Sequence, residues 1–181
     1  MGFWASPTTE PKRKYRWILN FGGTIGAVQQ YLIKNVTKPS FEISETEHKY
    51  INHTFWYPGR VTWNEVELTL VDPVSPDASA QMLKALKHSG YEYPLNPNTT
   101  QTISKANATE AISRFTISQL GANQGEVIEE WVLKNAWISK VNFGELDYES
   151  DDLVEISITV RYDFAVQQTT PQAPPAAPGQ A

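Results

Sequence analysis

The sequence predicts a mainly β protein, an antiparallel β-barrel or sandwich with one flanking α-helix. Three observations point to this fold class. Several segments alternate apolar and polar residues with the period of a half-buried strand, turn residues separate these segments, and a single segment carries both an apolar helical stripe and helix-end signals. At 181 residues the chain can form one domain with its own core and short tails.

The clearest strand is the segment 154–164, where apolar and polar residues alternate without interruption. One dry face and one wet face are typical of an antiparallel sheet that covers a core. The dry face consists of Val154, Ile156, Ile158, Val160, Tyr162 and Phe164, and the wet face of Glu155, Ser157, Thr159, Arg161 and Asp163. Further strands are expected over 15–21, 28–36, 64–70, 115–120, 127–133 and 137–143.

The segment 41–57 predicts a long hairpin that turns near 47–49. Its weak alternation and high polarity indicate that it lies outside the core. Pro58-Gly59-Arg60 is then expected to turn the chain into the strand 64–70, whose inward residues are Val66, Leu68 and Leu70. Trp63 falls on the polar side of that strand, which leaves two alternatives: a bulge or edge tryptophan, or packing against a neighbouring subunit.

One helix is predicted after this strand. Ser75 is suited to the N-cap, Pro76 to the first helical position, and basic residues gather before Gly90. The following segment 91–111 is polar, contains two prolines and lacks periodicity, so no element is predicted there.

The predicted organisation is an N-terminal arm over 1–14, a β-barrel domain over 15–166 and a flexible Pro/Ala-rich tail over 167–181. Phe3 and Trp4 in the arm are costly to leave in water, so docking on another subunit is an alternative to a disordered terminus.

Composition excludes several classes of function. The chain has no cysteine, which rules out disulfides, thiolate nucleophiles and cysteine-ligated zinc. A net charge of -5 argues against a general nucleic-acid-binding surface. No apolar run is long enough to span a membrane, so no membrane anchor is expected and the protein should be made in a cytoplasm.

Catalytic and metal-binding motifs receive no support, and no enzyme activity or cofactor is predicted. The three histidines do not share a ligand spacing. The acidic run 145–155 lacks the glycine and the final glutamate of a calcium loop, which indicates a solvated loop. The segment 18–26 is similar to the N-terminal signature of bacterial-type asparaginases, but Phe21 stands at the position of the threonine nucleophile, so a Gly-Gly turn is the better interpretation.

The order of the segments resembles the contractile-tail tube proteins of T-even-type phages and the tube proteins of contractile injection systems. The resemblance rests on WYPGRVTW, on ELTLVDP followed by one helix, and on EEWVLKNAWISKVNFGELDYESDDLVEISITVRYDF. It implies a subunit that forms hexameric rings, which stack into the hollow inner tube of a phage tail through which DNA passes without sequence-specific binding. The implied partners are further copies, the tail sheath, and the baseplate, tape-measure and tail terminator proteins, in a virion assembled in the host cytoplasm.

Two sets of site residues follow as hypotheses. Ring stacking is assigned to the arm and the hairpin region, through Phe3, Trp4, Glu45, Glu47, Lys49, Tyr50, Phe55, Trp56, Arg60 and Trp63. A negative lumen wall that repels DNA phosphates is assigned to Glu65, Glu67, Glu155 and Asp163. The alternatives are a baseplate tube-initiator or an injection-system tube subunit of the same fold and, from another class, a monomeric ligand-binding β-barrel.

Overall fold

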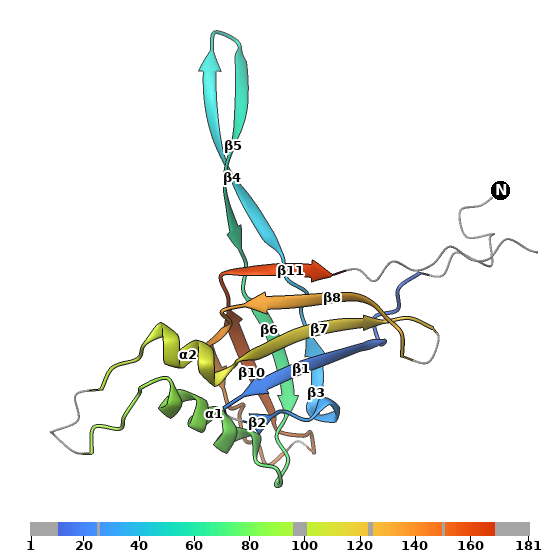
Figure 1. Ribbon diagram of the computed structural model, residues 1–181, viewed down its shortest axis with the longest axis vertical. Coiled ribbons are helices and arrows are strands. Elements are labelled where there is room, and N and C mark those ends of the chain that lie inside the picture. The colour runs from blue at the N-terminus through green and yellow to red at the C-terminus, as the bar shows by residue number, and fades with distance from the viewer. Residues whose placement is uncertain (1–10, 25, 96–100, 123–124, 150, 169–181) are drawn as a thin grey trace, which may run out of the picture.

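The computed structural model describes residues 11–24, 26–95, 101–122, 125–149 and 151–168, and shows two packed antiparallel sheets with a long hairpin that projects from them (Figure 1). The five-stranded sheet has the order β11 (Phe164–Gln168), β8 (Val127–Lys134), β7 (Arg114–Leu120), β1 (Trp17–Gly23) and β2 (Gly26–Ala27). The four-stranded sheet has the order β3 (Ile33–Val36), β6 (Val66–Val71), β10 (Glu155–Arg161) and β9 (Trp137–Asn142). The predicted mainly antiparallel β fold is therefore confirmed.

The core lies between the two sheets, and the predicted alternation places it correctly. Val66, Leu68 and Leu70 of β6 are fully buried opposite the inward residues of β10. Those partners are Val160, Ile158 and Ile156 respectively. From the other sheet, Leu19, Phe21, Phe115 and Ile117 join the cluster, with the rings of Phe21 and Phe115 packed edge to face at 5.5 Å.

The helix α1 (Ala78–His88) covers one open side of the sheets and buries Ala78, Met82 and Ala85. Its N-cap is Asp77, whose carboxylate accepts a hydrogen bond from Ala80 N at 2.8 Å, so the predicted N-cap at Ser75 is wrong. Asp72 also holds this end of the helix, because its carboxylate accepts from the backbone of Ala78 and from the Ser79 hydroxyl. These two carboxylates accept hydrogen bonds from backbone N–H groups of the first helical turn. Ser75 precedes that turn by three residues and does not cap it.

A second helix, α2 (Lys105–Ala111), lies beside α1 where no element was predicted. Ser104 caps it by accepting from Asn107 N at 3.2 Å. The helix is short and only Ala111 is buried, so its sequence shows no apolar stripe by which it could be recognised.

The projecting hairpin consists of β4 (Phe41–Tyr50) and β5 (His53–Trp63), joined at Ile51-Asn52. The predicted turn at 47–49 is wrong, and so is the turn at Pro58-Gly59-Arg60, which lies inside β5. Ser44 faces Gly59 and Arg60 together, and its hydroxyl accepts from Arg60 N at 2.9 Å. The residues that suggested a turn therefore form a β-bulge.

One further predicted strand begins later than expected, and another ends earlier. In the segment 28–36, a 3-10 helix (Gln30–Leu32) precedes β3, and the Gln30 side chain accepts from Leu19 N at 2.7 Å. The segment 154–164 breaks after Arg161, because the Asp163 N–H bonds to Lys134 O and the chain crosses into the other sheet as β11.

Candidate functional site

The hairpin β4–β5 is the most exposed ordered part of the described chain. Every residue of both strands is exposed except Trp63, which is half-buried. The strands pair only with each other, so both faces and both backbone edges meet solvent. A two-stranded ribbon of this kind is marginally stable alone, and exposed apolar patches and strand edges are typical of protein interfaces.

The two faces of the hairpin differ in chemistry. Because paired residues share a face, Tyr50, Phe55 and Tyr57 gather on one side together with His48 and His53. The other side carries Glu45, Glu47, Lys49 and Trp56, and Lys49 Nζ lies 2.9 Å from Glu47 Oε1. The hairpin therefore presents an aromatic face and a charged face with one tryptophan.

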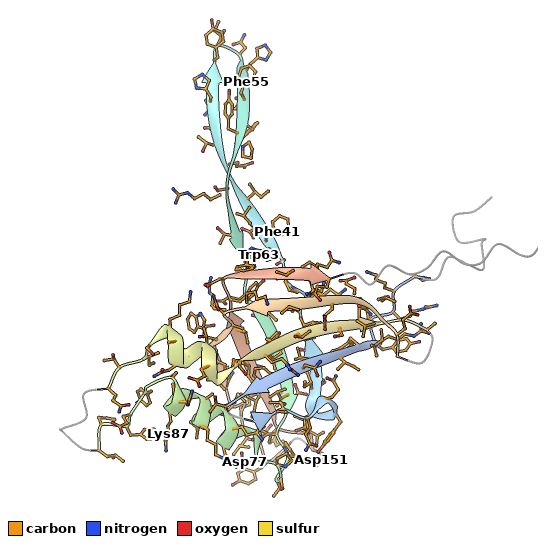
Figure 2. The ribbon with its side chains drawn as sticks, in the orientation of Figure 1. Phe41, Phe55, Trp63, Asp77, Lys87 and Asp151 are labelled. Carbon is orange, nitrogen blue, oxygen red and sulfur yellow. The ribbon has the colours of Figure 1, made fainter. Side chains whose placement is uncertain are left out.

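The root of the hairpin is fixed to the sheets by a row of aromatic rings. Trp63 packs against Phe41 at 5.4 Å and against Tyr162 at 6.0 Å, and it contacts the core (Figure 2). The Asn64 N–H also bonds to Ser40 O at 2.9 Å. Trp63 thus joins the hairpin to the end of β10 within one chain, and this anchors the direction in which the hairpin projects.

The hairpin region holds most residues of the predicted stacking set. Arg60 lies at the bulge, where Gly59 allows a close approach of the strands: an added Cβ would fall 3.0 Å from the Ser44 carbonyl oxygen. Phe3 and Trp4 lie outside the described residues. Further exposed apolar or aromatic residues of the hairpin were not among the predicted set: Phe41, Ile43, Ile51, Tyr57 and Val61. Tyr57 could have been predicted from the sequence, because it lies two positions after Phe55 and therefore shares a strand face with it.

The second candidate surface is the polar face of the four-stranded sheet, which we define by Glu65, Glu67, Glu155, Lys34, Lys140 and Arg161. Three of the four predicted lumen residues lie here. Glu65 Oε1 lies 2.5 Å from Arg161 Nε, and Glu155 forms an ion pair with Lys34. The hydrogen bond and charge of Glu155 raise the pKa of Lys34. Glu67 and Lys140 flank Thr159, so acidic and basic groups alternate across this face.

Asp163, the fourth predicted lumen residue, lies apart from the other three at the corner between β10 and β11. It accepts from Lys105 at 2.8 Å and from the Asn135 amide at 2.7 Å, and these hydrogen bonds lower the pKa of its carboxyl. Its position ties the start of α2 to the β8–β9 turn.

A buried carboxylate, Glu129, holds the root of the N-terminal arm and was not predicted. It accepts from Lys12, from Lys38 at 2.9 Å and from the Trp131 indole at 2.5 Å. Burial alone would raise its pKa, but these hydrogen bonds outweigh burial and lower the pKa of Glu129 to about 2. Gln119 adds bonds to the carbonyls of Arg13 and Arg16, so residues 12–16 are anchored to β7 and β8.

Among the described residues, no cluster of three or more His, Asp or Glu side chains is arranged to hold a metal ion. In the part of the chain that the structure describes, no helix has the length and apolar character needed to cross a membrane.

No known protein-family profile matches the chain, and no curated protein sequence matches it. Several solved structures, in contrast, have a similar fold. A chain in the anti-feeding prophage cap, described as the tube-terminating cap, has a TM-score of 0.66 and 18% identity and covers 94% of this chain and 100% of its own. A chain in the sheath-tube complex of PVC, an extracellular contractile injection system, has a TM-score of 0.62, 18% identity and coverages of 90% and 95%. The SPP1 tail tube has a TM-score of 0.54, 14% identity and coverages of 88% and 80%. The resemblance inferred from the sequence is therefore confirmed at the level of the fold: the chain has the fold of contractile-system tube and tube-cap proteins and of a tail tube.

Proposed function

We propose that this protein is a subunit of the inner tail tube of a contractile-tailed phage, in which hexameric rings stack into a hollow conduit for DNA. The single observation that carries the proposal is a long hairpin with apolar side chains on both faces, exposed on a chain that has the tube-protein fold. In this role the protein would contact the sheath, the baseplate, the tape-measure protein and the tail terminator, in a virion assembled in the host cytoplasm.

The direction of the strands supports closed rings. All neighbours in the four-stranded sheet are antiparallel, so its two edge strands, β3 and β9, run in opposite directions. A rotation that brings β3 of one copy beside β9 of the next therefore forms another antiparallel pair. Such a ring joins the two exposed edges and builds one continuous sheet around an axis.

Stacking of rings is assigned to the hairpin, with the arm as a second contact. The hairpin points away from the sheets, and a partner that covered its aromatic face would remove Tyr50, Phe55 and Tyr57 from water. The ion pair of Glu129 with Lys12 holds the described root of the arm against the sheets and supports this assignment. Deletion of residues 1–11 should give isolated rings in place of tubes, and normal tubes from this variant would count against a role for the arm.

The polar face of the four-stranded sheet is proposed as the lumen wall. Its carboxylates act by holding cations: Glu155 holds Lys34 and Glu65 holds Arg161. A lysine or arginine that is paired with a carboxylate attracts a passing DNA phosphate less strongly. DNA can then pass along the wall without binding to it. Lysine replacement of Glu65, Glu67 and Glu155 should slow DNA passage, and unchanged assembly and ejection rates would contradict this role. Asp163, the fourth predicted lumen residue, lies apart from this face.

Negative-stain microscopy of the purified protein tests the proposed function directly. Stacked rings with a central channel are expected. A baseplate tube initiator is the second candidate, because a chain of the anti-feeding prophage baseplate matches with a TM-score of 0.65 over 91% of this chain. A tube initiator would form single rings that do not elongate, and a monomeric ligand-binding barrel would give uniform small particles. An injection-system subunit would form similar tubes, but its tubes would carry protein cargo in place of DNA.

A further inference from the structure

An apolar cavity of about 350 Å³ opens between α1, α2 and the edge strand β9. Met82 and Leu86 line it from α1, Ala108 from α2 and Phe143 from the end of β9. Leu86 and Phe143 remain partly exposed at 38% and 41%. The cavity shares only Lys140 with the polar face described above and none of its lining with the hairpin.

The lining shows that the cavity runs along the free edge of the sheet. Residues 137 to 141 of β9 all border it. Successive strand residues point to opposite faces, so a cavity bordered by five consecutive residues lies along the strand edge and does not lie on one face. Strand β9 is an edge of its sheet in the described chain, so the mouth of the cavity coincides with unpaired backbone N–H and C=O groups.

A second copy of this chain satisfies both features together. The opposite edge of the same sheet is β3, whose direction suits antiparallel addition to β9. The start of β3 would then lie beside the end of β9, near Phe143. A small apolar ligand could fill the cavity but would leave the backbone edge unpaired.

The residue placed to enter the cavity is Tyr31, two positions before β3. Its neighbours hold it outward, because Leu32 is buried and the Gln30 side chain bonds to Leu19 N. Tyr31 is 72% exposed in the single chain. We propose that, in the ring, Tyr31 of one subunit inserts into the cavity beside β9 of the next and seals the lateral contact. This inference rests on the proposed ring and names the side chain and the cavity that close it.

Cysteine cross-linking tests the contact, because the native chain contains no cysteine. The double variant Tyr31→Cys/Phe143→Cys, assembled and then oxidised, should give a ladder of covalent oligomers on a denaturing gel. Each single variant should give no species larger than a dimer. A matched control, Gln167→Cys/Phe143→Cys, uses an exposed residue of β11 in the other sheet and should give no ladder.

Two further variants test the cavity itself. Tyr31→Ala should raise the protein concentration needed for ring formation by about tenfold or more, as for an interface anchor, while leaving the unfolding midpoint of the monomer unchanged. Ala108→Trp should fill the cavity and have the same effect on rings. Tyr148→Ala, at a fully exposed aromatic, should leave ring formation unchanged.

The outcomes separate this inference from the proposed function. Wild-type rings with no ladder from the Tyr31/Phe143 pair, and normal rings from Tyr31→Ala, would overturn the inference and leave the tube function standing. Absence of wild-type rings in microscopy would overturn both. Rings together with the specific ladder would support both.

Discussion

The hairpin β4–β5 and the strand pair β6–β10 use similar residues for opposite purposes. In β6–β10 the apolar side chains except Val71 point inward, and Val66, Leu70 and Ile156 are fully buried by the chain's own second sheet. In the hairpin, apolar side chains point to both sides and nothing in the described chain covers them. The two-sheet part therefore buries its apolar side chains within the chain, whereas the hairpin leaves its own exposed, and we propose that another chain covers them.

The largest expected effect comes from comparing two phenylalanines. Phe115 is 2% exposed and Phe55 is 51% exposed. Phe115→Ala should lower the free energy of unfolding by about 3–5 kcal/mol, measured by urea denaturation. Phe55→Ala should change it by less than about 0.5 kcal/mol and yet prevent tube formation in sedimentation. A Phe55→Ala variant that forms tubes at wild-type concentrations would show that the hairpin face has no partner there.

Trp63 lies at the boundary between the two regions, so its removal should affect both. Trp63→Ala removes the contacts with Phe41 and Tyr162 and should cost about 1–3 kcal/mol of unfolding free energy. Assembly should also fail because the hairpin loses its fixed direction. Trp63→Phe is the matched control and should restore most of both. Full assembly by Trp63→Ala would mean that the hairpin root does not need to be rigid.

Glu129 tests whether the arm root belongs to the folded unit. Glu129→Gln keeps the shape but removes the charge that Lys12 and Lys38 share, and at pH 7 it should cost about 1.5–3 kcal/mol. The folded-state pKa of about 2 lies below the ordinary value of 4.5. The stabilisation is therefore fully present above about pH 4.5 and is lost as the pH falls toward 2.

Urea titrations of both proteins between pH 6 and pH 2 provide the measurement for Glu129. The difference in unfolding free energy should shrink across that window. A constant difference at every pH would contradict the ion-pair explanation.

The smallest effect on stability is expected on the polar face of the four-stranded sheet. Glu155→Gln removes an exposed ion pair with Lys34 and should leave the unfolding free energy almost unchanged, because solvent screens exposed ion pairs. The freed lysine should increase the salt-sensitive retention of DNA by assembled tubes. Ser157→Ala on the same face is a suitable control. Equal DNA retention by both variants would contradict the proposal that Glu155 holds Lys34 away from DNA.

Alternation along single strands predicted the core but not the points where strands leave their sheets. The inward sets on β6 and β10 follow directly from a period of two. The break at Tyr162-Asp163 was not predictable from this pattern, because alternation continues through it and the crossing depends on bonds to Lys134 and Lys105. Pro58-Gly59 was misread because a bulge and a turn favour the same residues, and only the facing Ser44 distinguishes them.

The candidate site shows the same limit. The sequence predicted an exposed hairpin but could not separate its aromatic face from its charged face, because the turn position sets the pairing register and lies at Ile51-Asn52. The lumen carboxylates were predicted as a repulsive set. The ion pairs of Glu65 and Glu155 join residues 96 and 121 positions apart in sequence, and only the folded register reveals them.

Hydrogen exchange, measured in assembled and in dissociated protein, distinguishes a hairpin that another copy covers from one that stays exposed. Amides of β6 and β10 should be protected in both states, because these are the interior strands of their sheet and each is paired on both sides within the single chain. Amides of β4 and β5 should exchange rapidly in dissociated subunits and become protected on assembly. Equally rapid exchange of the hairpin in both states would contradict the claim that another copy completes it.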